Sequence, residues 1–216
     1  MVVEAGCQGR ASRSACNGAH INPMPHAVDW STFSYDISGE ELAECVFKLG
    51  EAILAFSTLE IQVARMLSAA FNTHVLPHGD ALVGTVDAIS KVKMLNGLAS
   101  IYGSDLQGII KDYKPVPELR ARLKDLAKLF EGLLKQRNVM AHGTLAKCDG
   151  RLILGSTQLS ARLRANGGSD SWVYFDEMSD YHRRCRAALA AAAVLRTDFE
   201  TAYGKLSAVG VEAVER

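Results

Sequence analysis

Cysteine is scarce in this sequence. The 216 residues include five cysteines, an odd number that is too small for a disulfide framework in a chain of this length. We therefore expect free thiols, which fits a reducing compartment such as the cytoplasm. The five are Cys7, Cys16, Cys45, Cys148 and Cys185.

The sequence also lacks long apolar runs. No stretch approaches the roughly 20 apolar residues that span a bilayer, although 48% of the chain is hydrophobic. The first twenty residues contain no apolar segment between a basic leader and a cleavage site, so they do not read as a secretory signal. We expect a cytoplasmic protein without a membrane partner.

Motifs for phosphate loops and metal sites are missing as well. The chain has no Gly-x-Gly-x-x-Gly, no Gly-Lys-Ser/Thr and no Gly-x-Ser-x-Gly. Cys7, Cys16, His20 and His26 are metal-ligand types, but their spacing fits no paired-ligand zinc motif. We expect no metal and no cofactor.

Net charge is zero, because 24 basic side chains balance 24 acidic ones, which argues against bulk binding to nucleic acid. The balance is not local. Between Asp29 and Glu60 seven acids stand against one base, Lys48, whereas between Lys135 and Arg164 six bases stand against one acid. Confined charged patches therefore remain compatible with a neutral chain, as does chance clustering on solvated faces.

Apolar residues recur at the three- and four-residue intervals of a helix face in four segments, at about 38–70, 86–103, 117–142 and 179–206. Ser38 and Glu41 have the spacing of a capping box at the start of the first segment. Pro117 suits the first turn of the third, and Gly143 is placed to cap its end. Residues 72–84 are expected to be a connection.

The pattern changes between the third and fourth segments. Asp149-Gly150 is a hairpin signal between two short β-like runs, and residues 172–175 form a third. The predicted fold is mainly α, a bundle of four to five helices with a small antiparallel β insertion at about 144–176, before the last long helix. We expect a flexible tail and packing segment at 1–37, the helical domain at 38–208 and a C-terminal tail at 209–216.

Three polar residues gather at the end of the third helix, in Arg137-Asn138-Val139-Met140-Ala141-His142. On a helix they share one sector, and Asn138 and His142 are an i, i+4 pair. Histidine can exchange protons with a 2′-hydroxyl or a leaving 5′-oxygen, arginine can bind phosphate with two hydrogen bonds, and asparagine can orient the imidazole. The trio suits metal-independent RNA cleavage. Its simpler reading is a basic helix end that matches the helix dipole.

The segment Arg137-Asn138-x-x-x-His142, within a helical bundle, resembles the R-x4-6-H motif of the HEPN family. The resemblance covers about residues 38–206. It implies a homodimer whose motifs face a shared cleft, which would supply a second histidine. It often implies a metal-independent endoribonuclease of toxin-antitoxin or phage-defence systems, with an antitoxin or regulatory protein as partner. Thr144 stands where toxins regulated by tyrosine modification carry tyrosine, so that control is not expected.

The resemblance also assigns roles to residues. Arg137, Asn138 and His142 are the expected catalytic group, and Glu60, which interrupts the apolar stripe of the first helix, is the candidate for supporting polar residue. Nearby phosphate contacts are expected from Lys135, Lys147 and Arg151. The alternatives are a non-catalytic HEPN-type interaction module and a helical bundle unrelated to the family. In either case Glu60 would be a solvated side chain.

Overall fold

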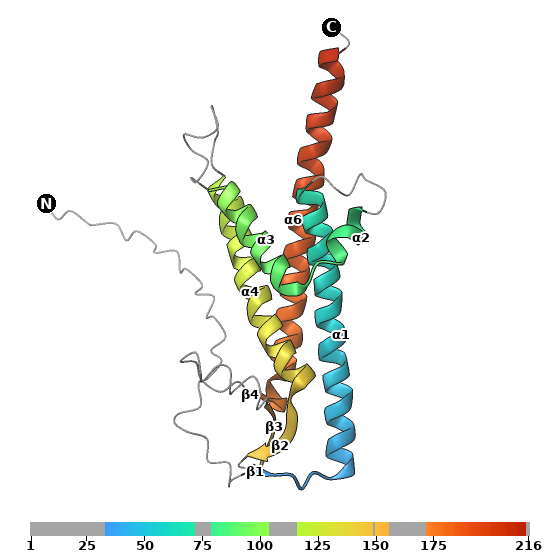
Figure 1. Cartoon of the computed structure of the whole chain (residues 1–216), viewed down its shortest axis with the longest axis vertical. Helices are drawn as coiled ribbons and strands as arrows, with labels where there is room; N and C mark the ends of the chain where they lie inside the picture. Colours follow the sequence, from blue (N-terminus) through green and yellow to red (C-terminus); the bar gives the residue numbers. More distant parts are fainter. Residues whose placement is uncertain (1–32, 72–78, 104–115, 149, 156–171, 215–216) are drawn as a thin grey trace, which may run out of the picture.

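The computed structural model describes residues 33–71, 79–103, 116–148, 150–155 and 172–214. Three long helices run through it: α1 (Gly39–Ala70), α4 (Pro117–His142) and α6 (Met178–Val214). The short helices α2 (Gly79–Gly84) and α3 (Ala88–Ile101) lie beside them at one end (Figure 1). The predicted helical class is confirmed.

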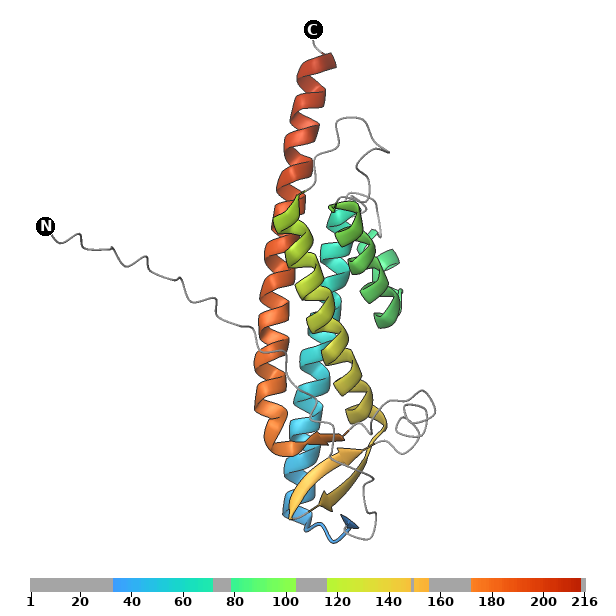
Figure 2. The ribbon, with the colours of Figure 1, turned by 90° about the vertical axis from the view of Figure 1, so that its left-hand side faces the viewer.

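A small antiparallel sheet closes the other end of the bundle (Figure 2). Its strands lie in the order β1 (Phe33–Ser34), β2 (Thr144–Cys148), β3 (Arg151–Gly155) and β4 (Trp172–Tyr174), and the 3-10 turn η4 (Phe175–Glu177) leads from β4 into α6. The predicted β insertion before the last helix is therefore present. The chain before α1 adds the edge strand β1, so part of the predicted packing segment lies on the sheet.

Helix α1 begins as its sequence predicts. The Ser38 hydroxyl accepts from the Glu41 amide and the Glu41 carboxylate accepts from the Ser38 amide, which completes the capping box. The buried face differs from the predicted stripe in the first turns, because Leu42 is 49% and Val46 61% exposed while Cys45 is buried. In these first turns a different side of α1 from the predicted one faces the core.

The three long helices share one core with the sheet. Phe56 of α1 stacks on Phe130 of α4, with ring centroids 5.4 Å apart. The fully buried Ala188 and Ala192 let α6 approach α1 and α4 closely. Leu154 and Val173 extend the same core into the strands. The thiols of Cys45, Cys148 and Cys185 are buried, as is typical of structural cysteines.

A predicted connection and the predicted C-terminal tail differ in detail from the structure. The expected connection at 72–84 contains α2, while residues 72–78 lie outside the described chain. Helix α6 continues to Val214, into the segment expected to be a tail. Among the residues described above, none of the helices carries an apolar run that would cross a lipid bilayer.

The junction between α4 and β2 is a single residue, Gly143. Gly143 caps the end of α4 as expected, and its backbone there is extended, with φ −80° and ψ 154°. A Cβ atom on Gly143 would lie 2.5 Å from the Val139 carbonyl oxygen and 3.3 Å from the Gly155 backbone. Glycine is required by close approach of two backbone segments, not by a positive φ.

Candidate functional site

The three motif residues occupy the last two turns of α4, next to the sheet. Arg137 and Asn138 are half-buried, and the Arg137 Nη1 donates a hydrogen bond of 3.2 Å to the Asn138 Oδ1. His142 is the last residue of α4 and is exposed. The structure therefore joins Arg137 to Asn138 directly and leaves the imidazole of His142 open to solvent.

Arg137 is a half-buried residue on the core face of α4. On the same face Phe130 and Leu133 come seven and four residues earlier and Met140 comes three residues later, and all three are buried. Beside Arg137 is Tyr181 of α6, whose hydroxyl donates to the Leu133 carbonyl over 3.5 Å. Burial raises the pKa of Tyr181, while the positive charges of Arg184 and Arg137 act in the opposite direction. The guanidinium of Arg137 thus sits at the edge of the packed interior.

A second contact between α4 and α6 lies next to the motif. The Arg184 Nη2 donates to the Gln136 Oε1, and the Arg184 Nε lies 3.3 Å from the Asp180 carboxylate. Arg184 is 16% exposed. The sequence did not predict this contact, because Gln136 and Arg184 are 48 residues apart in the chain and meet only when two helices pack together.

The three expected phosphate contacts each form an ion pair. The Lys135 Nζ lies 2.8 Å from Glu131, and the Lys147 Nζ lies 2.8 Å from Glu41. Arg151 pairs with Asp176 at 2.5 Å and stacks over the Tyr174 ring at 3.9 Å. Their positive charges are therefore largely offset, and a phosphate group would have to compete with a carboxylate for each one. The Lys135 pair lies within α4, the Lys147 pair joins β2 to α1, and the Arg151 pair joins β3 to η4.

Glu60 does not lie at the motif. Its carboxylate receives a 2.9 Å hydrogen bond from the Nζ of Lys91 on α3, whose side chain is 2% exposed. Helices α1 and α4 run in opposite directions (Figure 1), and the stacked rings of Phe56 and Phe130 mark one point at which they pack together. Counting along both helices from that contact puts Glu60 about 24 Å from His142 along the bundle axis. The predicted supporting role is replaced by a buried ion pair with Lys91.

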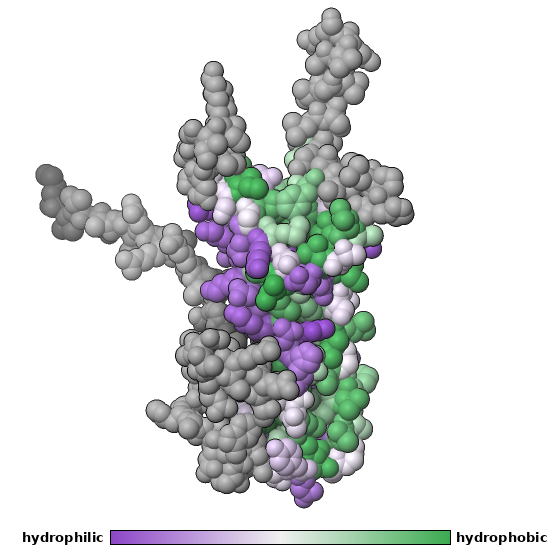
Figure 3. All heavy atoms as spheres, in the orientation of Figure 1, coloured by the Kyte–Doolittle hydropathy of each residue, from purple (hydrophilic) through white to green (hydrophobic). Residues whose placement is uncertain are grey.

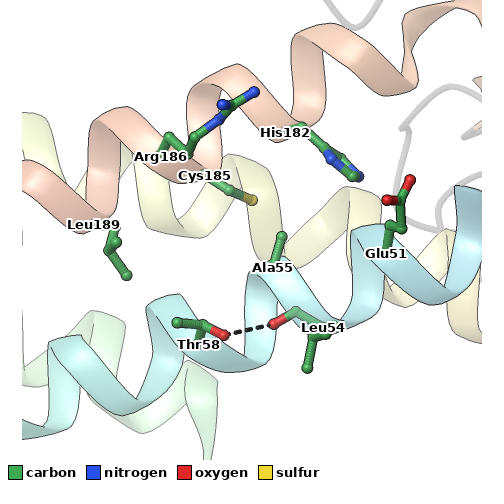
Figure 4. Close-up of a pocket in the computed structure, with 8 residues that line it drawn as sticks. All are labelled: Glu51, Leu54, Ala55, Thr58, His182, Cys185, Arg186 and Leu189. Atoms are coloured by element: carbon green, nitrogen blue, oxygen red, sulfur yellow. Dashed lines mark hydrogen bonds between the residues drawn. The ribbon is translucent and has the colours of Figure 1, made fainter.

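A hollow of about 330 Å³ lies between α1 and α6. His182 and Arg186 line it from α6, and Glu51 from α1, with the buried Cys185 at its floor (Figure 4). Burial raises the pKa of the Cys185 thiol to about 11, so this thiol is protonated at neutral pH. The hollow brings His182 and Glu51 to face each other, but it contains none of the three motif residues.

Three arginines near the start of α6, Arg183, Arg184 and Arg186, form a basic cluster that is partly neutralised. Arg183 and Arg184 both pair with Asp180 one turn earlier. Within the described residues, no three histidine, cysteine, aspartate or glutamate side chains converge as a metal site would require. The four tail residues whose spacing fits no zinc motif lie outside the described residues: Cys7, Cys16, His20 and His26.

Comparison of the chain with family models, with curated proteins and with solved structures finds no match. The case for a function therefore depends on the chain's own residues and on the motif resemblance.

Proposed function

We propose that the protein is a HEPN-like endoribonuclease that cleaves RNA without a metal ion. The observation that supports this most is the grouping of Arg137, Asn138 and His142 at one end of α4, where the imidazole is open to solvent and the guanidinium is held against Asn138. An RNA strand could reach this end from solvent, because His142 is exposed.

In the proposed reaction the 2′-oxygen of a ribose attacks the adjacent phosphorus, and the bond from phosphorus to the 5′-oxygen breaks. The products are a 2′,3′-cyclic phosphate and a 5′-hydroxyl. His142 accepts the proton of the 2′-hydroxyl or returns one to the departing 5′-oxygen. Arg137 stabilises the charge that develops on the phosphoryl oxygens, and its hydrogen bond to Asn138 fixes its position.

One histidine serves only one of the two proton transfers in this reaction. A second copy of the motif, brought close by two-fold symmetry, would serve the other. The role in toxin or phage-defence systems, with an antitoxin or regulatory partner, belongs to the same proposal and is supported by the motif resemblance alone.

The test is incubation of the purified full chain with mixed RNA in the presence of EDTA. We expect the wild type to release fragments that end in a cyclic phosphate, and His142→Ala and Arg137→Ala to release none. Two matched controls replace the same residue types elsewhere: His182→Ala on α6, and Arg122→Ala, whose guanidinium pairs with Asp198 at 2.8 Å. Both controls should keep the cleavage activity.

A second candidate is a non-catalytic HEPN-type interaction module. The ion pairs of Lys135, Lys147 and Arg151 favour it, because they leave little free positive charge for an RNA backbone near the motif. Absence of cleavage by the wild type, or equal cleavage by wild type and His142→Ala, would reject the endoribonuclease and leave this candidate.

A further inference from the structure

Helix α1 carries a second apolar face, turned away from the core. Phe47, Leu54 and Ile61 are spaced seven residues apart and are 65%, 69% and 56% exposed. Green, hydrophobic residues follow α1 along this edge of the molecule (Figure 3). A helix that needs only one packed face rarely displays a regular apolar row on the other.

Small residues alternate with the large ones on this face. Ala43, Gly50 and Ser57 are also seven residues apart, and the two rows interleave at intervals of four and three, the heptad spacing of paired helices. We call the six residues the outer stripe of α1. The Ser57 hydroxyl donates to the Ile53 carbonyl of its own helix over 3.0 Å, so that burying Ser57 would leave no polar group unsatisfied.

The contacts within a single chain do not explain why residue 50 is a glycine. It lies in the middle of a 32-residue helix, where glycine is unfavourable, and a Cβ atom there would meet no other atom within 4 Å. Its backbone is therefore bare at the centre of the outer stripe. Such a position permits the close approach of another helix.

We propose that the outer stripe is a self-association surface on which α1 of a second copy of this chain packs antiparallel, about a two-fold axis near residue 52. In that register each large residue faces a small one: Leu54 faces the partner's Gly50, Phe47 the partner's Ser57, and Ile61 the partner's Ala43. A two-fold interface between identical chains requires that the residues of one helix complement the same residues of the other helix read in the opposite direction, as they do here. Binding to an unrelated partner would not require this self-complementary pattern.

Charge along α1 favours the same orientation. The acids Glu40 and Glu44 lie near the start of the helix and Arg65 near its end. Glu40 and Arg65 are exposed, and neither forms an ion pair with another described residue. Antiparallel packing brings Arg65 to the partner's Glu40, whereas parallel packing would bring the acidic ends of two helices together.

This contact is separate from the shared cleft of the proposed endoribonuclease. Helix α4 packs on the core side of α1, opposite the outer stripe, so the two motifs of the α1 pair lie on its outer sides. The two contacts can therefore be tested separately, because loss of pairing in an outer-stripe variant such as Leu54→Lys would leave the shared cleft, and the proposed cleavage, untouched.

The oligomeric state tests the contact. We expect the full chain to sediment with at least twice its mass of 23.3 kDa, and Leu54→Lys and Gly50→Gln each to weaken pairing through the outer stripe by about 30-fold or more. Gly50→Gln also favours the helix, so any loss of pairing cannot come from unfolding. The controls are Gly97→Gln on α3, which has equal space around it, and Ile89→Lys, a 58% exposed apolar residue outside the stripe. Both should pair like the wild type.

Cross-linking tests the orientation, with Cys7 and Cys16 replaced by serine. Glu51→Cys lies near the two-fold axis and should link to its own copy through a short thiol-reactive linker. Ile61→Cys should not, because antiparallel packing separates the two copies of residue 61 by about 27 Å. A wild type that stays monomeric at its highest soluble concentration, pairing by Leu54→Lys at wild-type strength, or equal cross-linking at both positions would overturn the proposal.

Discussion

At the residue scale, the most consequential side chain outside the motif is Lys91. Its ammonium is 2% exposed and is balanced by one carboxylate, Glu60, with the Gly84 carbonyl 3.4 Å away. Removing a partner from a buried charge is costlier than never having buried the pair. The Glu60 side chain keeps 30% exposure, which moderates the cost.

We therefore expect Glu60→Gln to lower the free energy of unfolding by about 2 kcal/mol, below the value for a fully enclosed pair. Lys91→Met should be much milder, because it removes the charge that needs a partner. Urea denaturation of both variants measures this. Glu131→Gln, which breaks an exposed pair on α4, is the control and should change stability by about 0.5 kcal/mol or less. Equal effects of Glu60→Gln and Glu131→Gln would contradict the buried charge.

A second residue-scale prediction concerns Gly155, which pairs with Trp172 across β3 and β4. A Cβ atom on Gly155 would lie 1.7 Å from the indole ring, so the ring must move if any side chain is added. We expect Gly155→Ala to destabilise the fold by about 1–3 kcal/mol, as overpacking does. Gly97→Ala, in open space on a helix, should instead stabilise it by about 0.5–1 kcal/mol. Thermal and urea unfolding of the two variants measure whether each substitution lowers or raises the free energy of unfolding.

At the scale of elements, the start of α1 is held to β2 by charge. The ion pair with Lys147 and the hydrogen bonds from Ser38 lower the pKa of Glu41 from 4.5 to about 2. A carboxylate whose pKa is lower in the folded chain stabilises that chain above its ordinary pKa of 4.5. This stabilisation is lost as the pH falls from about 4.5 toward 2.

We expect the melting temperature of the wild type to fall more between pH 6 and pH 2.5 than that of Glu41→Gln. Glutamine can still accept the Ser38 hydrogen bond but carries no charge to titrate. Glu40→Gln changes the same charge one residue away and should keep the wild-type pH dependence. Parallel pH profiles for the wild type and Glu41→Gln would show that the pair with Lys147 contributes nothing.

Helices and turns could be predicted from local sequence signals, whereas contacts between elements distant in the chain could not. The capping box at Ser38 and the Asp149-Gly150 hairpin signal act within four residues, and the hairpin register, with Cys148 opposite Arg151, agrees with a two-residue turn. Gly150 has the positive φ of 75° that such a turn requires. The short helix α2 was missed because its six residues are too few for a periodic pattern.

For the candidate site, the sequence could predict only contacts between residues that are close together in the chain. Arg137 and Asn138 are neighbours in sequence, so their contact follows from the chain itself. Glu60 was assigned to the motif because it interrupts an apolar stripe, but an interruption does not show whether the side chain has a partner in the protein or which one. That partner, Lys91, comes from a helix whose packing is decided by the whole fold.

At the scale of the whole molecule, the bundle and the sheet share one interior. Leu154, Val173 and Phe175 belong to the same buried cluster as Phe56 and Phe130. Among the described residues, the other face of the sheet has only a separate cluster of Ala146, Cys148 and Ile153, which is too small to keep the sheet folded when the helices separate.

We expect far-ultraviolet circular dichroism and the fluorescence of Trp172, measured in a Trp30→Phe background, to report the same unfolding transition in urea. Phe130→Ala should shift both by the same amount, about 3–5 kcal/mol, although Phe130 and Trp172 lie on different elements. An earlier fluorescence transition would mean that the sheet unfolds by itself.

The one-residue junction at Gly143 also constrains how the sequence can change in length. With α4 held in place, one residue inserted between His142 and Thr144 would shift β2 by one position against β3, which would turn its side chains to the opposite face of the sheet and exchange the buried Ala146 with its neighbours. The length of the junction from His142 to Thr144 is thus fixed by geometry. Over evolutionary time, insertions and deletions in descendants of this chain should be rejected in that interval and accumulate elsewhere.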